Sequence, residues 1–350
     1  MRSSTSSSEG RGPWAGGRGG RHRRRRQWLA VAAGLVSALV CGAAGRVLLL
    51  RAAGLGDVPE IVATEEPAPA SSFYLAHDRG GHVDHHVLYH GVDRRALENL
   101  RRADVLLLGN SRLMFAFRRP DLRAFFPRHG LTYYVLGFGH REHDAFPRAI
   151  IRRFDLRPRL VIVNADRFFL GDQSPWADRV VDDSWFDALK LWFEAEAAHV
   201  VRRAVHRWLP HVPDLVDGER EFIAYRSRED GTWLVANTFA GLGARMASDD
   251  GRPATPDANK LAHARAFKQE VEARGGQLVL GLVPAPTASR ATAEWLAREL
   301  GVPLIAPAPE GLRTHDGSHL TPESAASFAE AFFAELEPVV QQFGLSRGAR

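Results

Sequence analysis

Short apolar runs alternate with amphipathic stretches along the chain beyond about residue 90. Five runs have the length and composition of buried strands, at residues 105–108, 133–136, 160–163, 278–283 and 303–305. Seven amphipathic stretches predict helices, at residues 94–102, 119–126, 144–153, 185–208, 257–274, 291–300 and 321–343. Strands that are apolar throughout are typical of a parallel sheet covered on both faces. The alternation therefore predicts a single doubly wound α/β domain.

Residues 210–251 do not follow this alternation. Two apolar stretches, 221–225 and 233–236, flank the dipeptide Asp230-Gly231, which is typical of a hairpin turn. We interpret this segment as an insertion that lies near the mouth of the functional site.

The N-terminal part of the chain has a different pattern. Residues 1–27 are rich in Ser, Gly and Arg and predict a disordered basic tail. Residues 28–45 are uncharged, and the apolar stretch continues to residue 50 around Arg46, which is long enough for one transmembrane helix over 28–50. A linker rich in Pro and Ala follows at 51–72, and the folded domain is expected over 73–345.

The charge pattern around the predicted span gives its orientation. Five arginines lie at residues 21–26, directly before the span, so the tail is expected in the cytoplasm and the domain on the far side. This predicts a single-pass protein of the inner (cytoplasmic) membrane, with its domain in the periplasm or extracytoplasmic space. The alternative is a cleaved export signal, because Arg25-Arg26 precedes the apolar stretch and small residues lie at 42–45.

Composition narrows the functional classes. The chain has 350 residues, 45% hydrophobic and 25% charged, as ordinary globular proteins do. Its single cysteine, Cys41, excludes an intramolecular disulfide framework and any multi-cysteine metal site. A net charge of +5 could indicate nucleic-acid binding. Many of the basic residues, however, are the arginines at the N-terminus, and the orientation of the predicted membrane span explains these arginines better.

Two segments carry candidate catalytic side chains. Ser111 follows the first predicted strand directly, and in parallel α/β sheets ligands bind beyond the carboxyl ends of the strands. The alternative role for this serine is helix capping. Asp316 and His319 lie three residues apart across a glycine, a spacing that lets the carboxylate orient the imidazole as a base. Arg112, beside the serine, is expected to pair with a nearby carboxylate rather than hold a substrate anion.

These two segments resemble the conserved blocks of the SGNH, or GDSL-like, hydrolase superfamily. Residues 105–112 are similar to the family's strand followed by Gly-Asp-Ser, with Asn110 in the place of the usual Asp, and residues 316–321 resemble its Asp-x-x-His block. The resemblance implies a three-layer α/β/α doubly wound fold. It also implies that Ser111 is the nucleophile, His319 the general base and Asp316 its orienting acid.

The resemblance further implies an oxyanion hole built from two middle blocks. A glycine is expected after the second core strand, where Gly139 or Gly137 is available. An amide is expected after the third, where either Asn164 is the donor or Asp166 occupies its place. No cofactor and no metal are expected for this chemistry.

The differences from the superfamily's usual sequence blocks are similar to those of divergent, membrane-anchored members such as the alginate O-acetyltransferase-like proteins. The resemblance thus implies a serine-dependent acyl-ester hydrolase or O-acyltransferase that acts on a cell-envelope polysaccharide or glycan. The membrane and a membrane-bound acyltransferase are the implied partners, and nucleic acid is not. The alternative is a catalytically inactive scaffold of this fold, or a glycan-binding subunit of an envelope polysaccharide complex.

Histidines are unusually dense at residues 77–90. His86 and His90 are four residues apart and could share a metal ion on one helical face, helped by Asp84. We instead expect this segment to be solvated or to form a rim of the cleft.

Overall fold

The computed structural model describes residues 72–78, 81–139, 142–208, 223–236, 245–247 and 257–346. The chain divides into two compact units, Met1–Gly54 and Leu55–Arg350, and all described residues belong to the second. The predicted tail, the predicted span at 28–50 and nearly all of the predicted linker lie outside the described residues. Within the part that is described, no helix is both long and apolar enough to cross a membrane.

The core of the domain is a five-stranded sheet in which every neighbouring pair is parallel. Its strands, in spatial order, are β10 (Leu304–Ile305), β9 (Gln277–Gly281), β5 (Leu160–Asn164), β3 (Val105–Gly109) and β4 (Tyr133–Gly137). Of the strands in this sheet, β3 comes first along the chain, and it lies between β4 and β5, which come second and third. The five predicted strands and their parallel arrangement are confirmed.

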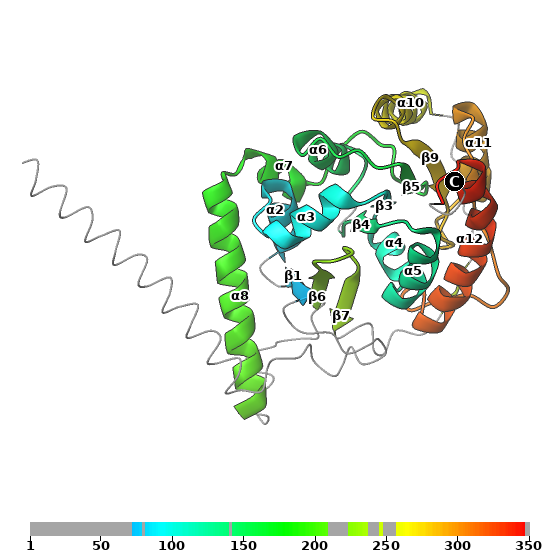
Figure 1. Ribbon diagram of the computed structural model, residues 1–350. Coiled ribbons are helices and arrows are strands. Elements are labelled where there is room, and N and C mark those ends of the chain that lie inside the picture. The colour runs from blue at the N-terminus through cyan, green and yellow to red at the C-terminus, as the bar shows by residue number, and fades with distance from the viewer. Residues whose placement is uncertain are drawn as a thin grey trace, which may run out of the picture. The chain divides into compact units, whose positions relative to one another are not determined.

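Helices cover both faces of this sheet (Figure 1). Alternate side chains of β3 point to opposite faces, so Leu106 and Leu108 belong to one apolar cluster and Val105 and Leu107 to the other. The first cluster includes side chains of α3 (Arg94–Arg102), α6 (Ala145–Arg153), α7 (Pro175–Asp182), α10 (Ala258–Ala273) and α11 (Arg290–Leu300). The second includes side chains of α4 (Ser111–Ala116), α5 (Arg119–Phe125) and α12 (Pro322–Gln342). The doubly wound α/β prediction is confirmed.

The predicted helices are all present. The helices predicted at 94–102 and 185–208 have the bounds of α3 and of α8 (Trp185–Trp208), and the other five differ by one residue at one or both ends. The sequence pattern did not reveal α2 (Val83–His90), α7 or the short 3₁₀ helix at Pro127–His129.

A second, antiparallel sheet holds the predicted hairpin. Its strands, in spatial order, are β2 (Gly81–His82), β1 (Phe73–Asp78), β6 (Ile223–Ser227) and β7 (Trp233–Ala236). The hairpin β6–β7 is confirmed, but β6 also pairs with β1, where the sequence analysis predicted no strand. A short two-stranded sheet joins β8 (Arg245–Met246) to β11 (Arg313–Thr314).

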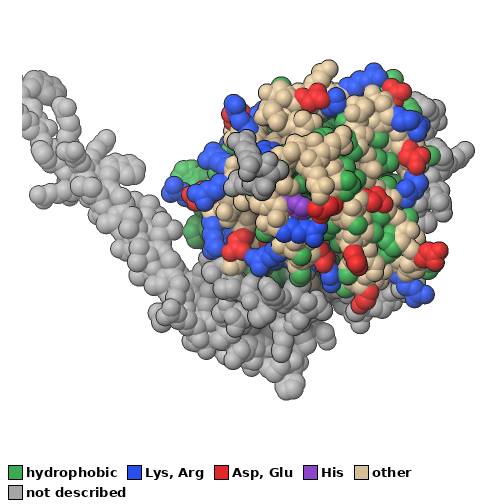
Figure 2. Space-filling view, turned by 45° about the vertical axis from the view of Figure 1, so that its right-hand side comes forward, with side chains coloured by type: hydrophobic (Ala, Val, Ile, Leu, Met, Phe, Trp, Pro, Cys, Tyr) green, Lys and Arg blue, Asp and Glu red, His purple; other side chains and the backbone are tan. Residues whose placement is uncertain are grey.

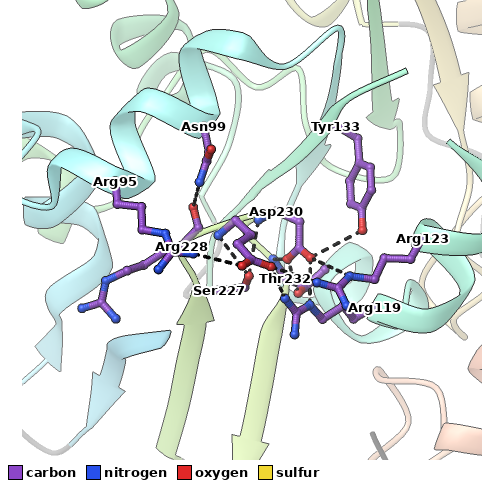
Figure 3. Close-up of polar contacts among 10 residues, drawn as sticks. Arg95, Asn99, Arg119, Arg123, Tyr133, Ser227, Arg228, Asp230 and Thr232 are labelled. Atoms are coloured by element: carbon purple, nitrogen blue, oxygen red, sulfur yellow. Dashed lines mark hydrogen bonds and ion pairs between the residues drawn. The ribbon is translucent and has the colours of Figure 1, made fainter. Parts of the chain in front are cut away.

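The hairpin turn covers the edge strand β4 of the central sheet. The Val135 N–H donates to the Asp230 carbonyl over 2.8 Å. Gly231 has a φ of 72°, and a Cβ there would lie 2.3 Å from the Val135 oxygen, so only glycine fits. The buried Arg119 of α5 binds the Asp230 carboxylate at 2.9 Å and also bonds Glu229 (Figure 3). Covering β4 in this way removes an exposed sheet edge.

The expectation for the histidine-rich segment was wrong. All residues of α2 are buried, and His85, His86 and His90 are only 0%, 5% and 8% exposed. The helix is buried because its polar groups have partners inside the domain: His86 bonds Asp183 at 2.8 Å, and His90 bonds the Val180 carbonyl at 2.9 Å. Among the described residues no cluster of three metal-ligating side chains is found.

Candidate active site

Ser111 lies at the carboxyl edge of the central sheet because β3 ends two residues before it. Asn110 is extended, with φ −92° and ψ −168°, and its side chain accepts the Arg112 N–H at 3.0 Å, which caps α4. Ser111 is the first residue of that helix. A Cβ at Gly109 would lie 3.0 Å from Cβ atoms of Asn164 and Leu113, so glycine permits this close turn.

His319 and Asp316 lie in the tight loop that leads into α12. The Asp316 Oδ1 accepts the main-chain N–H groups of Ser318 and His319, each at 2.9 Å. Gly317 allows the turn with a φ of 80°. Thr321 caps α12, whose first residue is Pro322. The loop is thus fixed by its own hydrogen bonds.

The fold brings these three side chains into one hydrogen-bonded chain. His319 Nδ1 lies 2.8 Å from Asp316 Oδ2, and His319 Nε2 lies 2.8 Å from the Ser111 Oγ, a residue 208 positions away. Because the carboxylate accepts the Nδ1–H, the Nε2 lone pair faces the serine hydroxyl, which donates to it. The contacts that join the three candidate catalytic side chains are therefore present.

The protonation states suit a base at neutral pH. Burial lowers the pKa of His319 below its usual 6.5, with the Asp316 carboxylate opposing that shift and the nearby Arg112 charge reinforcing it. Burial alone would raise the pKa of Asp316, but the His319 N–H and imidazole hold it below its usual value. At pH 7 the imidazole is therefore neutral and the carboxylate is ionised.

Arg112 connects its own loop to three others around the serine, those of Asp166, Ser318 and Thr287. Its guanidinium pairs with Asp166 and donates to Ser318 Oγ at 3.1 Å and to Thr287 Oγ1 at 2.6 Å. The two charged side chains are 11% and 2% exposed, so water screens their pairing little. Burial raises the pKa of Asp166, against the opposing charge of Arg112. The expected pairing of Arg112 is confirmed, and the Asp166 carboxylate is directed at the arginine rather than acting as an oxyanion donor.

Gly137 and Gly139 lie beside Ser111 because β4 neighbours β3. Gly137 is the last residue of β4 and pairs with Gly109, while Gly139 follows in a buried turn. In the described part of the chain, no main-chain carbonyl accepts the N–H of Ser111 or of Gly139. With respect to the residues that the structure describes, these two N–H groups are therefore available as donors, whereas Gly137 contributes its carbonyl, which accepts from Arg226.

Asn164 ends β5, which is the other neighbour of β3. Its Oδ1 accepts the Val283 N–H at 3.1 Å. Its Nδ2 is buried without a hydrogen-bond partner among the residues that the structure describes. An unpaired buried donor costs about 1–3 kcal/mol, so its retention needs a reason.

The sequence analysis missed side chains that support the site from a distance. The Phe115 ring lies 4.6 Å from the His319 ring, centroid to centroid, and limits how the imidazole can tilt. Arg226 comes from the second sheet and reaches the Gly137 carbonyl. Neither residue lies in a recognisable motif, and the only signal for Arg226 was a charged residue in an apolar strand.

Comparisons with known proteins add little. No family model matches the chain, and no curated protein matches it. The fold is similar to a crystal structure from Bacteroides fragilis described as "a putative acylhydrolase", with 13% identity and a TM-score of 0.33 over 72% of this chain and 98% of that one. We base neither fold nor function on a similarity of this size.

The pKa of His319 provides a test of the site that needs no substrate. In an NMR titration of full-length protein carrying ¹³C-labelled histidine, we expect the pKa of His319 to lie below 6.5. The His319→Gln variant identifies its signal among those of the 15 histidines. Asp316→Asn removes the charge that raises this pKa, so the titration moves to still lower pH. A His319 that titrates at or above 6.5, or that moves upward in Asp316→Asn, contradicts the described electrostatics.

Proposed function

We propose that this chain is a serine-dependent acyl-ester hydrolase or O-acyltransferase with a three-layer fold of the SGNH type. One observation carries the proposal: Ser111 Oγ, His319 and Asp316 form a continuous chain of 2.8 Å contacts at the carboxyl edge of the sheet. A neutral imidazole beside a serine hydroxyl can remove its proton as the oxygen attacks.

The mechanism follows from these contacts. His319 Nε2 takes the proton of Ser111 as Oγ bonds to the ester carbonyl carbon, and Asp316 stabilises the imidazolium that forms. The N–H groups of Ser111 and Gly139 receive the oxyanion. The Asn164 Nδ2, which has no partner among the described residues, adds a donor once the carbonyl reaches it. The tetrahedral intermediate then expels the alcohol, which takes the proton from His319.

The acyl-serine left behind can react with two nucleophiles. His319 deprotonates either a water molecule, which gives hydrolysis, or a sugar hydroxyl, which gives transfer. Both outcomes use the same three residues, so the proposal includes both. We assign a glycan of the cell envelope as the substrate, on the basis of the predicted membrane span at 28–50 and the resemblance of residues 105–112 and 316–321.

A catalytically inactive scaffold needs none of these arrangements. A neutral His319 in contact with Ser111, and a buried Asn164 Nδ2 that finds no partner in the described part of the chain, favour an enzyme over a scaffold. The face shown in Figure 2 mixes basic, acidic and apolar side chains without one large patch of a single charge. That nucleic acid is no partner stays a prediction.

The proposed location is the outer side of the cytoplasmic membrane, and it can be tested with cysteine labelling. In a Cys41→Ser background, we expect the exposed Glu330→Cys to react with a membrane-impermeant maleimide in intact spheroplasts. Ser3→Cys is expected to react only after lysis, because the N-terminal arginines hold the tail in the cytoplasm. The opposite labelling pattern, or a chain lacking the tail, would contradict a single-pass anchor of this orientation.

The nucleophile is tested by labelling full-length, detergent-purified protein with a fluorophosphonate probe. We expect labelling of the wild type, none of Ser111→Ala, and a rate at least about 100-fold lower in His319→Ala, because the general base is lost. The exposed Ser327→Ala is the matched serine control and should label at the wild-type rate. A folded wild type that does not label, or a Ser111→Ala variant that does, refutes the proposed enzyme.

A further inference from the structure

Four charged or titratable side chains form a network with almost no exposure to solvent. Arg226, Asp84 and His85 are each 0% exposed, and Glu142 is 1% exposed. Arg226 bonds Asp84 Oδ2 at 3.0 Å, the other Asp84 oxygen bonds His85 Nδ1 at 2.9 Å, and His85 Nε2 bonds Glu142 Oε1 at 3.2 Å. The network therefore runs without a break from β6, through the start of α2, to the segment after β4.

A network of this kind rarely adds much stability. Taking several charges out of water costs free energy that their mutual attraction often fails to recover, and well-packed apolar side chains would serve the core as well. Its best-attested use is to fix one arrangement of the groups that it contacts.

Arg226 holds the end of β4. Its guanidinium donates to the Val135 carbonyl at 2.8 Å and also to the Gly137 carbonyl. The Phe138 N–H, on the same peptide plane as the Gly137 carbonyl, donates to the Gly109 carbonyl at 3.0 Å. This peptide plane is thus fixed from both sides, by the second sheet and by the strand that leads to Ser111.

The next two residues are fixed by the other members of the network. The Phe138 ring has the Arg226 guanidinium carbon 5.2 Å from its centroid and the His85 ring 4.7 Å from it. The Glu142 N–H contacts the Gly139 carbonyl at 3.4 Å, and the Glu142 carboxylate is bound by His85. The Gly139 N–H is left without a main-chain acceptor among the described residues.

We propose that the buried network of Arg226, Asp84, His85 and Glu142 positions the Gly139 N–H as an oxyanion donor, which makes Arg226 a positioning residue supplied by the second sheet. The inference rests on the proposed acyl-ester chemistry. Oxyanion donors act only if they are already in place before the negative charge develops. An arginine fixed by three carbonyls and a carboxylate supplies this constraint, because its planar donors point in set directions.

The test compares two buried arginines that bind the same hairpin region. Arg226→Lys keeps the charge that Asp84 needs, but its single nitrogen cannot reproduce the planar arrangement in which two guanidinium nitrogens reach the Val135, Gly231 and Gly137 carbonyls. Arg119→Lys weakens the contact with the Asp230 carboxylate, which lies 3.5 Å from the hydroxyl of Tyr133, the first residue of β4. Glu142→Gln is a milder third variant, because it removes the charge and one of the two acceptor oxygens but keeps the other. Each is made in the full-length protein and assayed with p-nitrophenyl acetate, thermal unfolding and hydrogen exchange.

We expect Arg226→Lys to lower kcat about 10- to 100-fold with KM nearly unchanged, because the lost interaction is made mainly in the transition state. Glu142→Gln should lower kcat in the same way by a smaller factor. Arg119→Lys should lower the melting temperature while kcat stays within about twofold of the wild type. Equal kcat losses in Arg226→Lys and Arg119→Lys, or no loss in Arg226→Lys and Glu142→Gln, overturn the inference. If Arg226→Lys does not fold, Glu142→Gln decides by the same criterion.

Hydrogen exchange separates this inference from the proposed function. The segment from Gly137 to Asp144 should exchange faster in Arg226→Lys than in wild type and at the wild-type rate in Arg119→Lys. An unreactive wild type that shows this exchange pattern refutes the proposed enzyme but supports positioning of the turn. Unchanged exchange in both Arg226→Lys and Glu142→Gln refutes the positioning role whatever the activity.

Discussion

The central strands must be buried on both faces, and the rest of the structure depends on this constraint. Residues 105–108 of β3 are all 0% exposed, so helices have to cover the sheet from each side. Crossover connections of this kind keep the strands parallel, and parallel strands end at the same edge. Ser111 after β3, Gly139 after β4 and Asn164 at the end of β5 therefore meet there. The loop before α12 then brings His319 to the serine, which closes the site.

Two arginines fix the positions of these loops relative to one another. Arg112 joins the serine loop to Asp166 and to Ser318, beside the catalytic histidine of the proposed mechanism. Arg226 acts on the opposite side of the serine, where it holds the Gly137 carbonyl from a separate sheet. Both guanidinium groups are largely or fully buried, so their hydrogen bonds are strong and directional. The two sheets are thus joined through the candidate site itself.

Much of this arrangement was predictable because local patterns determine it. The apolar runs predicted all five central strands, and the spacing of Asp316 and His319 predicted their mutual contact. The β1 strand of the second sheet was missed because it gains its partner β6 only through folding, across about 150 residues. The histidines of α2 were misread for a related reason. Their burial depends on Asp183 and Glu142, which are distant in the sequence, and composition alone cannot show that a polar side chain will find a buried partner.

The central claim is that Ser111 forms a covalent acyl intermediate with the help of His319. Rapid-quench mass spectrometry of the full-length protein mixed with p-nitrophenyl acetate tests it most directly. The account predicts an acetyl group that appears on the peptide containing Ser111, in step with the first release of p-nitrophenol. An acetyl group on another side chain, or p-nitrophenol release that is unchanged when Ser111 is replaced by alanine, would contradict it.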